Sequence, residues 1–490
     1  MISLLEIANR AYSGHRMNEK EWNIRLFKTM QKLISENDLT YSGPEQYYGV
    51  DDDYVDRAFQ ATIQFLVEQG TFCVSTNRVI QFTEDEILTA VKATPNQFIV
   101  GNGRDARIIQ KREIEDHTRV NVISGGHCPW PLEIAPMAQA AYASVPYGDI
   151  IEGFNFTSID GHEVHGLPIA VYAARREAAV MREAVRMAGR PGMAFTLYPI
   201  LTKSGPLIAP IDPETGLRRT DGLLLSILPD MKVEADYIAT ALAYEGYGGY
   251  KVNGGCFSVV GGFCGGIEGA MIETMAKAIT AWIVYRDVFQ YQCGVTGSES
   301  LTARWTPLME SEARKAPRFT VPIWPTYVVN RALANYTNII RFGGFGGGAG
   351  VGGMGSESEL LNIAKNTLMS TLLGVNLACT TGQNPTPYHV EFKAQVADAV
   401  VEAHIRKDEL PELIHKLEAA VKARLGGKSS IGYGDRRMLA YKNFDHYFKP
   451  MQILFNFATQ TPNPPLIASV KKAQATLLDL GMDLEAAAIH

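Results

Sequence analysis

The sequence predicts an α/β fold: a TIM (β/α)8 barrel with an N-terminal helical extension and C-terminal helices. From about Val120 onward, short apolar runs that end in Gly, Pro or Asn alternate with longer helical stretches. This alternation continues over roughly 330 residues, which predicts a parallel sheet, and at that length closure into eight strands is the economical arrangement. With 490 residues, of which 46% are apolar, the chain can bury a large core.

Individual elements follow from local patterns. Apolar residues recur at intervals of three and four over 19–36 and 52–69, which predicts two amphipathic helices, and Thr83 with Glu86 forms a capping box for a third. Strands are expected in 120–124, 149–156, 193–200, 302–305 and 338–342. Helical periodicity returns in 393–426 and 469–482. We therefore predict a helical extension over 1–118, the barrel over 119–425, and a C-terminal irregular and helical segment over 426–490.

Composition excludes several classes of function. A net charge of -6 and a pI near 6.0 are unsuited to binding nucleic acid. The six cysteines lack the CxxC spacing of a zinc ribbon and the density of a disulfide framework. The N-terminus does not read as a signal peptide, and no window reads as a membrane span. These observations predict a cytoplasmic protein with no nucleic-acid or membrane partner.

Four segments in order carry a family resemblance. They are FCVSTNRVIQFTEDEILTAVKATPNQFIVGNGRDAR at 72–107, AGRPGM at 188–193, GGFCGGIEG at 261–269 and ARW at 303–305. Together they resemble the monomethylamine methyltransferases, with divergent stretches at 207–221 and 342–355. The resemblance implies a TIM barrel, methyl transfer from a methylated amine to the corrinoid of a cognate corrinoid protein, and a homo-oligomer. It also implies that the corrinoid is carried by the partner, so no tightly bound cofactor is expected on this chain.

The resemblance also exposes a departure. It implies a pyrrolysine in the loop after AGRPGM, but the loop 201–210 contains none, and Lys203 is its lysine. Lys203 is either a stand-in for a modified lysine or an ordinary solvated loop residue. One acidic partner of the family falls near Asp230, which the resemblance makes a candidate catalytic carboxylate, and another falls near Gly255, where the carboxylate is lost. We therefore predict a member of the family that lacks pyrrolysine.

The chemistry of the leaving group narrows the class of methylated amine that is expected as the substrate. A neutral amine leaves poorly unless it is protonated or captured, whereas a quaternary ammonium compound already carries its charge and departs as a neutral tertiary amine. Such a substrate is suited to an aromatic cage, since cation–π contacts contribute roughly 0.5 to 2 kcal/mol each. Aromatic residues are expected at strand ends, where each either belongs to a substrate-binding cage or packs in the core. They are Trp130, Phe154, Phe156, Phe195, Tyr198, Trp305 and Trp324.

Polar candidates lie after the same strands. His127 is a candidate general acid or substrate hydrogen-bonding group, Glu152 is expected to face the barrel or pair with a base such as Arg104, and Asn155 closes the same strand. The HEVH sequence at 162–165 lacks the spacing of a metal pair and is interpreted as surface polarity or a helix start. No metal site is predicted. Arg104 and Asp105 are interpreted as a structural ion pair.

Nine glycines occupy the thirteen positions from Gly343 to Gly355. The run lacks the end of a P-loop, so no nucleotide is implied. Because it follows a strand, it is expected on the catalytic rim, where Gly346, Gly347 and Gly348 either face the corrinoid or form a flexible loop. Two functions remain open: a corrinoid-dependent methyltransferase, and a non-catalytic barrel or binding protein derived from the family. A third reading is a different reaction that uses His127.

Overall fold

The fold is given by a computed structural model of the chain. It describes residues 1–41, 50–125, 130–154, 156, 158–164, 169–197, 214–254, 257–291, 294–296, 324–343, 353–379, 385–425 and 444–487. These residues form two compact units, each assembled from segments distant in sequence. Unit 1 comprises Met1–Phe98, Gly222–Ser298 and Ala316–Phe342, and unit 2 comprises Ile99–Asp221, Glu299–Lys315 and Gly343–His490. The predicted boundaries after residues 118 and 425 stay a prediction.

Eight strands form the central sheet: β5 (Val122–Gly125), β6 (Ile150–Glu152), β9 (Ala194–Leu197), β10 (Gly222–Leu224), β12 (Tyr250–Gly254), β14 (Val288–Tyr291), β16 (Arg341–Phe342) and β17 (Leu377–Cys379). Their order in the sheet is β16-β14-β12-β10-β9-β6-β5-β17. The last strand, β17, pairs in parallel with the first, β5. Gly343, directly after β16, donates its N–H to the carbonyl of Asn376, directly before β17, at 2.9 Å. The predicted (β/α)8 barrel is therefore confirmed.

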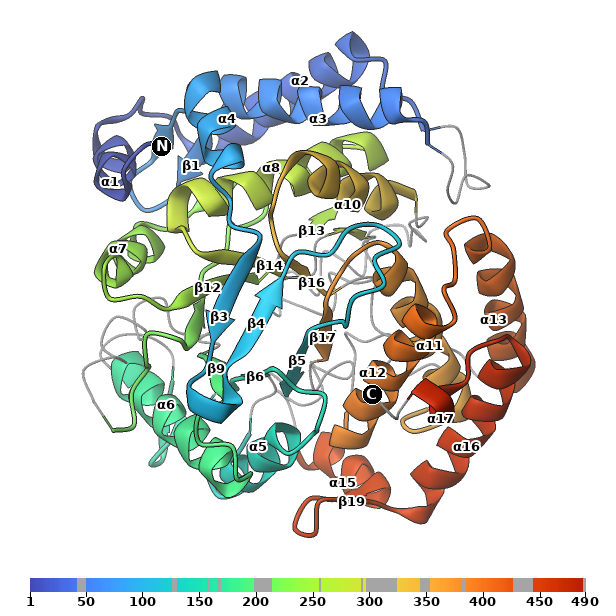
Figure 1. The fold of residues 1–490 in the computed structure, drawn as a ribbon. Coiled ribbons are helices and arrows are strands. Elements are labelled where there is room, and N and C mark those ends of the chain that lie inside the picture. The colour runs from blue at the N-terminus through green and yellow to red at the C-terminus, as the bar shows by residue number, and fades with distance from the viewer. Residues whose placement is uncertain are drawn as a thin grey trace. The chain divides into compact units, whose positions relative to one another are not determined.

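Unit 1 begins with helices whose ends are set by side-chain caps. Helices α1 (Leu4–Ser13), α2 (Glu19–Glu36), α3 (Asp52–Gln69) and α4 (Glu84–Lys92) have Ser3, Asn18, Asp51 and Thr83 as N-caps. The capping box predicted at Thr83 is present, because Thr83 and Glu86 bond each other's backbone N–H. Helices α2 and α3 have the predicted bounds and pack on α8 (Ile267–Tyr285), as Figure 1 shows.

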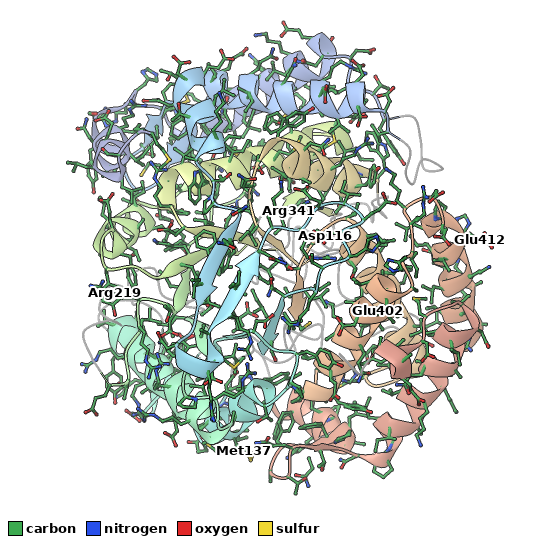
Figure 2. All side chains as sticks on the ribbon, viewed as in Figure 1. Asp116, Met137, Arg219, Arg341, Glu402 and Glu412 are labelled. Atoms are coloured by element: carbon green, nitrogen blue, oxygen red, sulfur yellow. The ribbon has the colours of Figure 1, made fainter. Side chains whose placement is uncertain are left out.

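The strands of unit 1 pack their side chains in two directions. Asn253 of β12 donates to Gln290 of β14 at 2.7 Å, and Gln290 donates to the carbonyl of Ala278 in α8. The side chains of Asn253 and Gln290 therefore face the helices. Arg341 (Figure 2), in register with Gln290, is 1% exposed and donates to the carbonyl of Asn330 in α10 (Trp324–Tyr336) at 2.6 Å. Side chains alternate along a strand, so the neighbouring residues form the opposite, apolar face. There the rings of Tyr250 and Phe342 both contact Phe289.

Unit 2 surrounds its strands with helices. Helices α5 (Ala135–Ala143) and α6 (Ile169–Met187) pack together beside β5, β6 and β9. Helix α11 (Glu357–Leu372) packs on α12 (Pro387–Glu402), α13 (Leu410–Leu425) and α16 (Pro464–Asp479), and α17 (Leu484–Ala487) packs on α12 (Figure 1). Ser356, directly after the glycine run, is the N-cap of α11. The predicted C-terminal helical stretch is divided, since residues 403–409 separate α12 from α13.

The remaining elements complete the described chain. They are β1 (Thr71–Cys73), β2 (Arg78–Ile80), β3 (Gln97–Val100), η1 (Gly103–Asp105), β4 (Arg107–Gln110), β7 (Ser158–Ile159), β8 (His162–Glu163), β11 (Lys232–Val233), α7 (Ala235–Tyr244), β13 (Phe257–Val259), β15 (Gly294–Thr296), α15 (Phe444–Leu454), β18 (Phe455–Asn456) and β19 (Thr461–Pro462). The predicted strand at 302–305 lies outside the described residues.

Candidate functional site

The carboxyl ends of β5, β6 and β9 place a polar pair on one face of the sheet in unit 2. Glu152 of β6 stands in register with Thr196 of β9 and with Gly125 of β5. The residues one position earlier on these strands face the helices. Ser124 donates to the carbonyl of Tyr142 in α5 at 2.9 Å, and Phe195 packs on α6. Because side chains alternate along strands, Glu152 and Thr196 point to the opposite face, the inner face of the barrel.

Both side chains of this pair are buried, Glu152 to 2% exposure and Thr196 to 2%. Parallel neighbours lie about 4.8 Å apart, so the carboxylate and the hydroxyl stand side by side at the edge where (β/α)8 enzymes carry their active sites. Gly125 keeps the third strand close, since its φ is +93° and a Cβ there would lie 2.9 Å from the carbonyl oxygen of Glu152. Glu152 thus has the inward direction expected from the sequence, whereas Thr196 was not foreseen.

Phe195 does not occupy a strand-end cage. Its ring lies on the side of α6, where the Arg182 guanidinium carbon is 4.4 Å from the ring centroid. Arg182 in turn forms an ion pair of 2.5 Å with Asp221, and both are buried. The prediction that Phe195 binds substrate at the barrel mouth is therefore contradicted by its packing, because a one-residue step along the strand reverses the face.

Trp130 and Trp324 are both deeply buried. Trp130 is 2% exposed and makes edge-on contacts with Phe448 and Phe457 of the C-terminal segment, at centroid distances of 5.6 and 6.0 Å. Trp324 begins helix α10 and does not end a strand, so its predicted position was wrong. Its ring packs against Tyr41 and Tyr54, with centroids 5.1 and 5.2 Å away. Phe154 and Phe156 contact each other edge-on at 4.8 Å.

Asp230 belongs to unit 1 and sits in a network of charged residues. Trp22 of α2 donates its indole N–H to the Asp230 carbonyl at 2.8 Å, and Asp230 donates its own N–H to the Glu273 carboxylate of α8 at 2.8 Å. Its carboxylate lies 3.4 Å from Lys232, which also binds Glu19 at 2.8 Å. Burial, and then the negative charge of Glu273, raise the pKa of Asp230. These contacts join α2 to α8, and the catalytic role of Asp230 stays a prediction.

A second buried polar group, in unit 2, lies at the first turns of α11 and α12. His389 and Glu359 are 0% exposed, with Nε2 of His389 3.7 Å from Oε2 of Glu359. His389 Nδ1 lies 2.7 Å from the Thr386 hydroxyl, and the Glu359 carboxylate accepts the N–H of Gly355. Helices of a (β/α)8 barrel begin at its catalytic end, so this pair belongs to the same edge as Glu152. No local sequence pattern could have joined the two residues, since Glu359 is thirty positions away from His389.

Two minor interpretations are settled by the structure. Arg104 and Asp105 do not pair with each other: Arg104 donates to the carbonyl of Gly189 at 2.6 Å, whereas Asp105 accepts the N–H of Gly192 at 2.9 Å and lies 4.0 Å from Arg190. The proposed pairing of Glu152 with Arg104 is likewise absent from the described contacts. His162 and Glu163 are exposed in a small antiparallel hairpin, which agrees with surface polarity.

Several predicted site residues lie outside the described residues. These are His127, Asn155, Tyr198, Trp305, Gly346, Gly347 and Gly348, together with Lys203. Among the residues that are described, no group of three or more His, Cys, Asp or Glu side chains is arranged to hold a metal ion. No helix in the same residues is long and apolar enough to cross a membrane. Cys73, Cys264 and Cys379 are buried free thiols, and burial raises the pKa of Cys379 to about 11.

Comparison with known proteins gives a consistent result. The family model described as "Monomethylamine methyltransferase MtmB" matches residues 2–304. MtmB2 of Methanosarcina acetivorans is 30% identical over 281 residues, which cover 56% of this chain and 60% of that protein. MtmB of Methanosarcina mazei is 29% identical over 280 residues, with the same coverage of each. The matched region thus spans about 60% of these relatives.

In fold, the likeness to solved structures extends over nearly the whole chain. The crystal structure of the Methanosarcina barkeri monomethylamine methyltransferase has a TM-score of 0.78, and the match covers 98% of each chain at 22% identity. The structure of the hydroxylamine complex of MtmB has a TM-score of 0.77 with the same coverage. Because the family model spans more than half of the sequence, this chain belongs to the monomethylamine methyltransferase family.

Proposed function

We propose that this protein transfers a methyl group from a methylated amine to the cobalt of a corrinoid carried by a cognate partner protein. Family membership supports the reaction class, and the buried carboxylate of Glu152 at the carboxyl end of β6 is the observation that carries the proposal on this chain. A (β/α)8 barrel places substrate at this edge, and a carboxylate there stabilises a cationic nitrogen. When the partner is docked, its reduced cobalt supplies the nucleophile.

We further propose that the substrate is a quaternary ammonium compound. In the transfer, the bond between nitrogen and the methyl carbon breaks while a bond between that carbon and cobalt forms. The electron pair of the broken bond stays on nitrogen, so a quaternary substrate leaves as a neutral tertiary amine without proton transfer. A protein that lacks pyrrolysine and its covalent capture of the amine is suited to this leaving group. The absence of pyrrolysine is part of the proposal, and Lys203 lies outside the described residues.

Glu152 and Thr196 have distinct roles in this proposal. The Glu152 carboxylate stabilises the positive charge on nitrogen in the bound substrate and the part of that charge that remains in the transition state, whereas the neutral product amine is released more easily. Thr196, in register beside it, orients a polar group of the substrate or holds the carboxylate. Both residues lie on strands, which hold side chains more rigidly than loops do, so the methyl group can be aligned with cobalt. Gly346 to Gly348 remain the proposed corrinoid-facing segment, and a homo-oligomer is proposed from the family.

The test uses reduced cobalamin in place of the partner's corrinoid. The purified full chain is incubated with cob(I)alamin and, separately, with methylamine, dimethylamine, trimethylamine, tetramethylammonium, choline and glycine betaine, while the methylcobalamin spectrum is followed. We expect methyl transfer from at least one quaternary compound and none from methylamine. Glu152→Gln is expected to lower kcat/KM by roughly 100-fold or more, since it removes the charge that faces the cation. Glu183→Gln, at an exposed carboxylate of α6, is the matched control.

The outcomes separate the alternatives. Transfer from methylamine alone would refute the quaternary substrate while keeping the methyltransferase. Folded protein that demethylates none of these compounds, with or without a cognate corrinoid protein, would favour the non-catalytic barrel.

A further inference from the structure

Glu359 caps the start of helix α11 with a carboxylate that is buried from water. The Ser356 hydroxyl accepts the N–H of Glu359 at 3.2 Å, and the Glu359 carboxylate accepts the N–H of Gly355. The capping carboxylates of helices α2 and α4, on Glu21 and Glu86, reach solvent, whereas Glu359 is 0% exposed. Capping does not require burial, and a buried carboxylate is unfavourable unless other groups stabilise its charge. The burial of Glu359 therefore indicates a role beyond capping.

His389 faces this carboxylate from the neighbouring helix α12. Its Nε2 lies 3.7 Å from Oε2 of Glu359 and forms no hydrogen bond with the residues that the structure describes. Its Nδ1 lies 2.7 Å from the hydroxyl of Thr386, which fixes the orientation of the ring. All three side chains are 0% exposed. A proton on Nε2, directed at the carboxylate in this low-dielectric environment, stabilises the negative charge of Glu359.

The pair holds a turn over residues 353–356, which ends the glycine run and leads into α11. Gly355 in this turn has a φ of +72°, and a Cβ there would lie 2.7 Å from the side chain of Leu454. The backbone of the turn is thus packed closely, but a glycine has no side chain with which to fix its own position. The hydrogen bond from the N–H of Gly355 to the carboxylate of Glu359 supplies that anchor.

Buried contacts join this anchor to the strands that carry Glu152. Lys393, one helical turn after His389, is 8% exposed and donates to the carbonyl of Ala378 in β17 at 3.1 Å. Strand β17 pairs in parallel with β5, which pairs with β6, the strand that ends at Glu152. The turn over 353–356 precedes α11, and helices of a (β/α)8 barrel begin at its catalytic edge. The turn therefore lies at the same edge as the proposed substrate site.

We propose that Glu359 and His389 are positioning residues for methyl transfer, which hold the turn over 353–356 in the place where the corrinoid of the partner protein docks. This role rests on the proposed function. Neither side chain contacts the methyl group. Glu359 acts through the N–H of Gly355, and His389 stabilises the Glu359 carboxylate and directs it at that N–H. Loss of either side chain should therefore impair the use of the corrinoid, while the binding of the amine, which depends on Glu152, is unchanged.

The test is steady-state kinetics of the full chain, with cob(I)alamin and the transferred amine varied in turn. Glu359→Ala should raise the KM for cob(I)alamin about tenfold or more and leave the KM for the amine within about twofold, because a displacement of about 1 Å suffices for such a loss. Glu359→Gln retains an oxygen that accepts the N–H of Gly355 and should restore most of the affinity for cob(I)alamin. His389→Leu should raise the same KM selectively, by about threefold or more.

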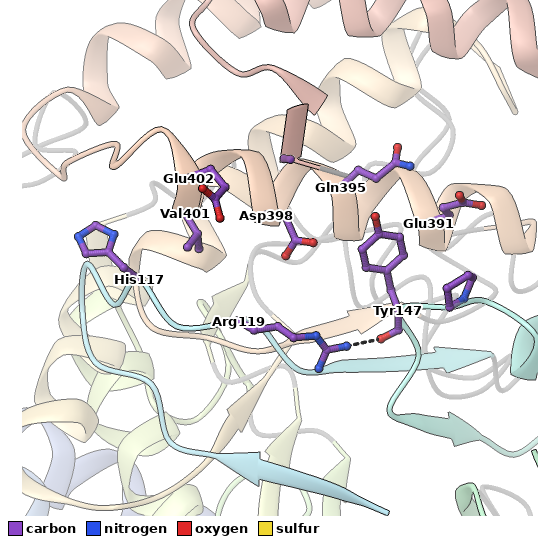
Figure 3. A pocket seen from close by; sticks show the side chains of 10 residues that line it. His117, Arg119, Tyr147, Glu391, Gln395, Asp398, Val401 and Glu402 are labelled. Carbon is purple, nitrogen blue, oxygen red and sulfur yellow. Dashed lines mark hydrogen bonds between the residues drawn. The ribbon is translucent and has the colours of Figure 1, made fainter. Parts of the chain in front are cut away.

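The matched control is Glu402→Gln, at the opposite end of α12. Glu402 comes thirteen residues after His389, about 20 Å along the helix, and lines a cavity of about 470 Å³ that Figure 3 shows. Arg119 and Tyr147 line the same cavity just before β5 and β6 begin, so it lies at the amino ends of the strands. Glu402→Gln should leave both KM values unchanged.

Two measurements that need no turnover keep the result decisive. Hydrogen–deuterium exchange at the N–H of Gly355 should be at least about tenfold faster in Glu359→Ala than in the wild type. The affinity for hydroxocobalamin, measured by equilibrium dialysis, should fall at least about fivefold in the same variant. Thermal melting shows that each variant is folded, and Glu359→Gln provides a second variant of the anchor.

The outcomes separate this role from the proposed function. If the wild type transfers no methyl group, the proposed function fails, and a loss of hydroxocobalamin affinity in Glu359→Ala still supports the anchor. Equal increases in both KM values would indicate a general structural role and would overturn the proposal. An unchanged KM for cob(I)alamin in Glu359→Ala and His389→Leu, or hydroxocobalamin affinity equal in Glu359→Ala and the wild type, would overturn it as well.

Discussion

The buried ion pair between Arg182 and Asp221 gives the sharpest prediction about stability. Arg182 is 0% and Asp221 is 1% exposed, and the two are 2.5 Å apart. Asp221 also accepts the N–H of Arg218 at 2.8 Å and of Phe195 at 3.2 Å, which anchors strand β9 and with it Thr196. Burial raises the pKa of Asp221 in spite of Arg182, so the pair does not fully offset its own desolvation.

Breaking this pair on one side should therefore be far more harmful than replacing it. Asp221→Asn leaves the Arg182 guanidinium buried without its carboxylate and should lower the free energy of unfolding by about 3 to 5 kcal/mol. Arg182→Met strands the carboxylate and should have a similar effect. In the double variant, Asn still accepts backbone N–H groups and Met fills the space of the arginine. We expect it to recover at least about 2 kcal/mol relative to the sum of the single changes.

The assay is urea unfolding at pH 7, followed by circular dichroism, on the wild type, both single variants and the double variant. Arg186→Met is the control, because Arg186 and its partner Glu183 are about half exposed and 3.8 Å apart. It should change stability by less than about 1 kcal/mol. If Asp221→Asn unfolds within about 1 kcal/mol of the wild type, or if the two single effects simply add, the reasoning from burial is refuted.

Three further predictions concern the site, its strand and the carboxyl of Asp398 on α12. At Gly125 the φ angle is +93°, and a Cβ would lie 2.9 Å from the carbonyl oxygen of Glu152, whereas Gly189 has a positive φ with no atom within 4 Å. Gly125→Ala should therefore destabilise the protein by at least about 1 kcal/mol more than Gly189→Ala. Equal melting temperatures of the two variants would contradict this. Phe195→Leu should lower stability by roughly 1 to 3 kcal/mol but leave the relative kcat/KM among methylated substrates unchanged, and a changed preference would restore Phe195 to the site. Burial raises the pKa of Asp398 from 3.8 to about 6, so ionisation of this carboxyl destabilises the folded state. Between pH 4 and 7 the stability of the wild type should therefore fall by about 1 to 2 kcal/mol relative to that of Asp398→Asn. If the melting temperatures of the two proteins change in parallel with pH, this reasoning is refuted.

Local sequence patterns predicted much of the fold. The helices over 19–36 and 52–69 have the predicted bounds because apolar periodicity and N-caps are encoded within a few residues. The strands before Gly125 and around Phe195 were found because β-rich runs end at glycine and proline. Repeated strand–helix alternation over roughly 330 residues then led to the barrel, and the ordered segments at 72–107, 188–193, 261–269 and 303–305 led to the family.

The candidate site was harder to predict from the sequence. Alternate residues of a strand face opposite sides of the sheet, and which side is buried against helices depends on residues that are distant in sequence. Phe195 and Thr196 are adjacent, and only the packing of Arg182 on the phenylalanine shows which of them faces inward. Trp324 reads as a strand-end aromatic but starts a helix, and its neighbours Tyr41 and Tyr54 are more than 260 residues away in sequence.

The sequence by itself therefore determined the class of the protein: a (β/α)8 barrel of the monomethylamine methyltransferase family, with its helices placed by short-range periodicity and capping. Tertiary structure alone decided which residues share an environment. It brought Glu152 beside Thr196 and Glu359 beside His389. The physical reason is that helix and strand formation depends on neighbours a few positions apart, whereas burial, charge pairing and side-chain direction arise only when the strands have assembled into one sheet.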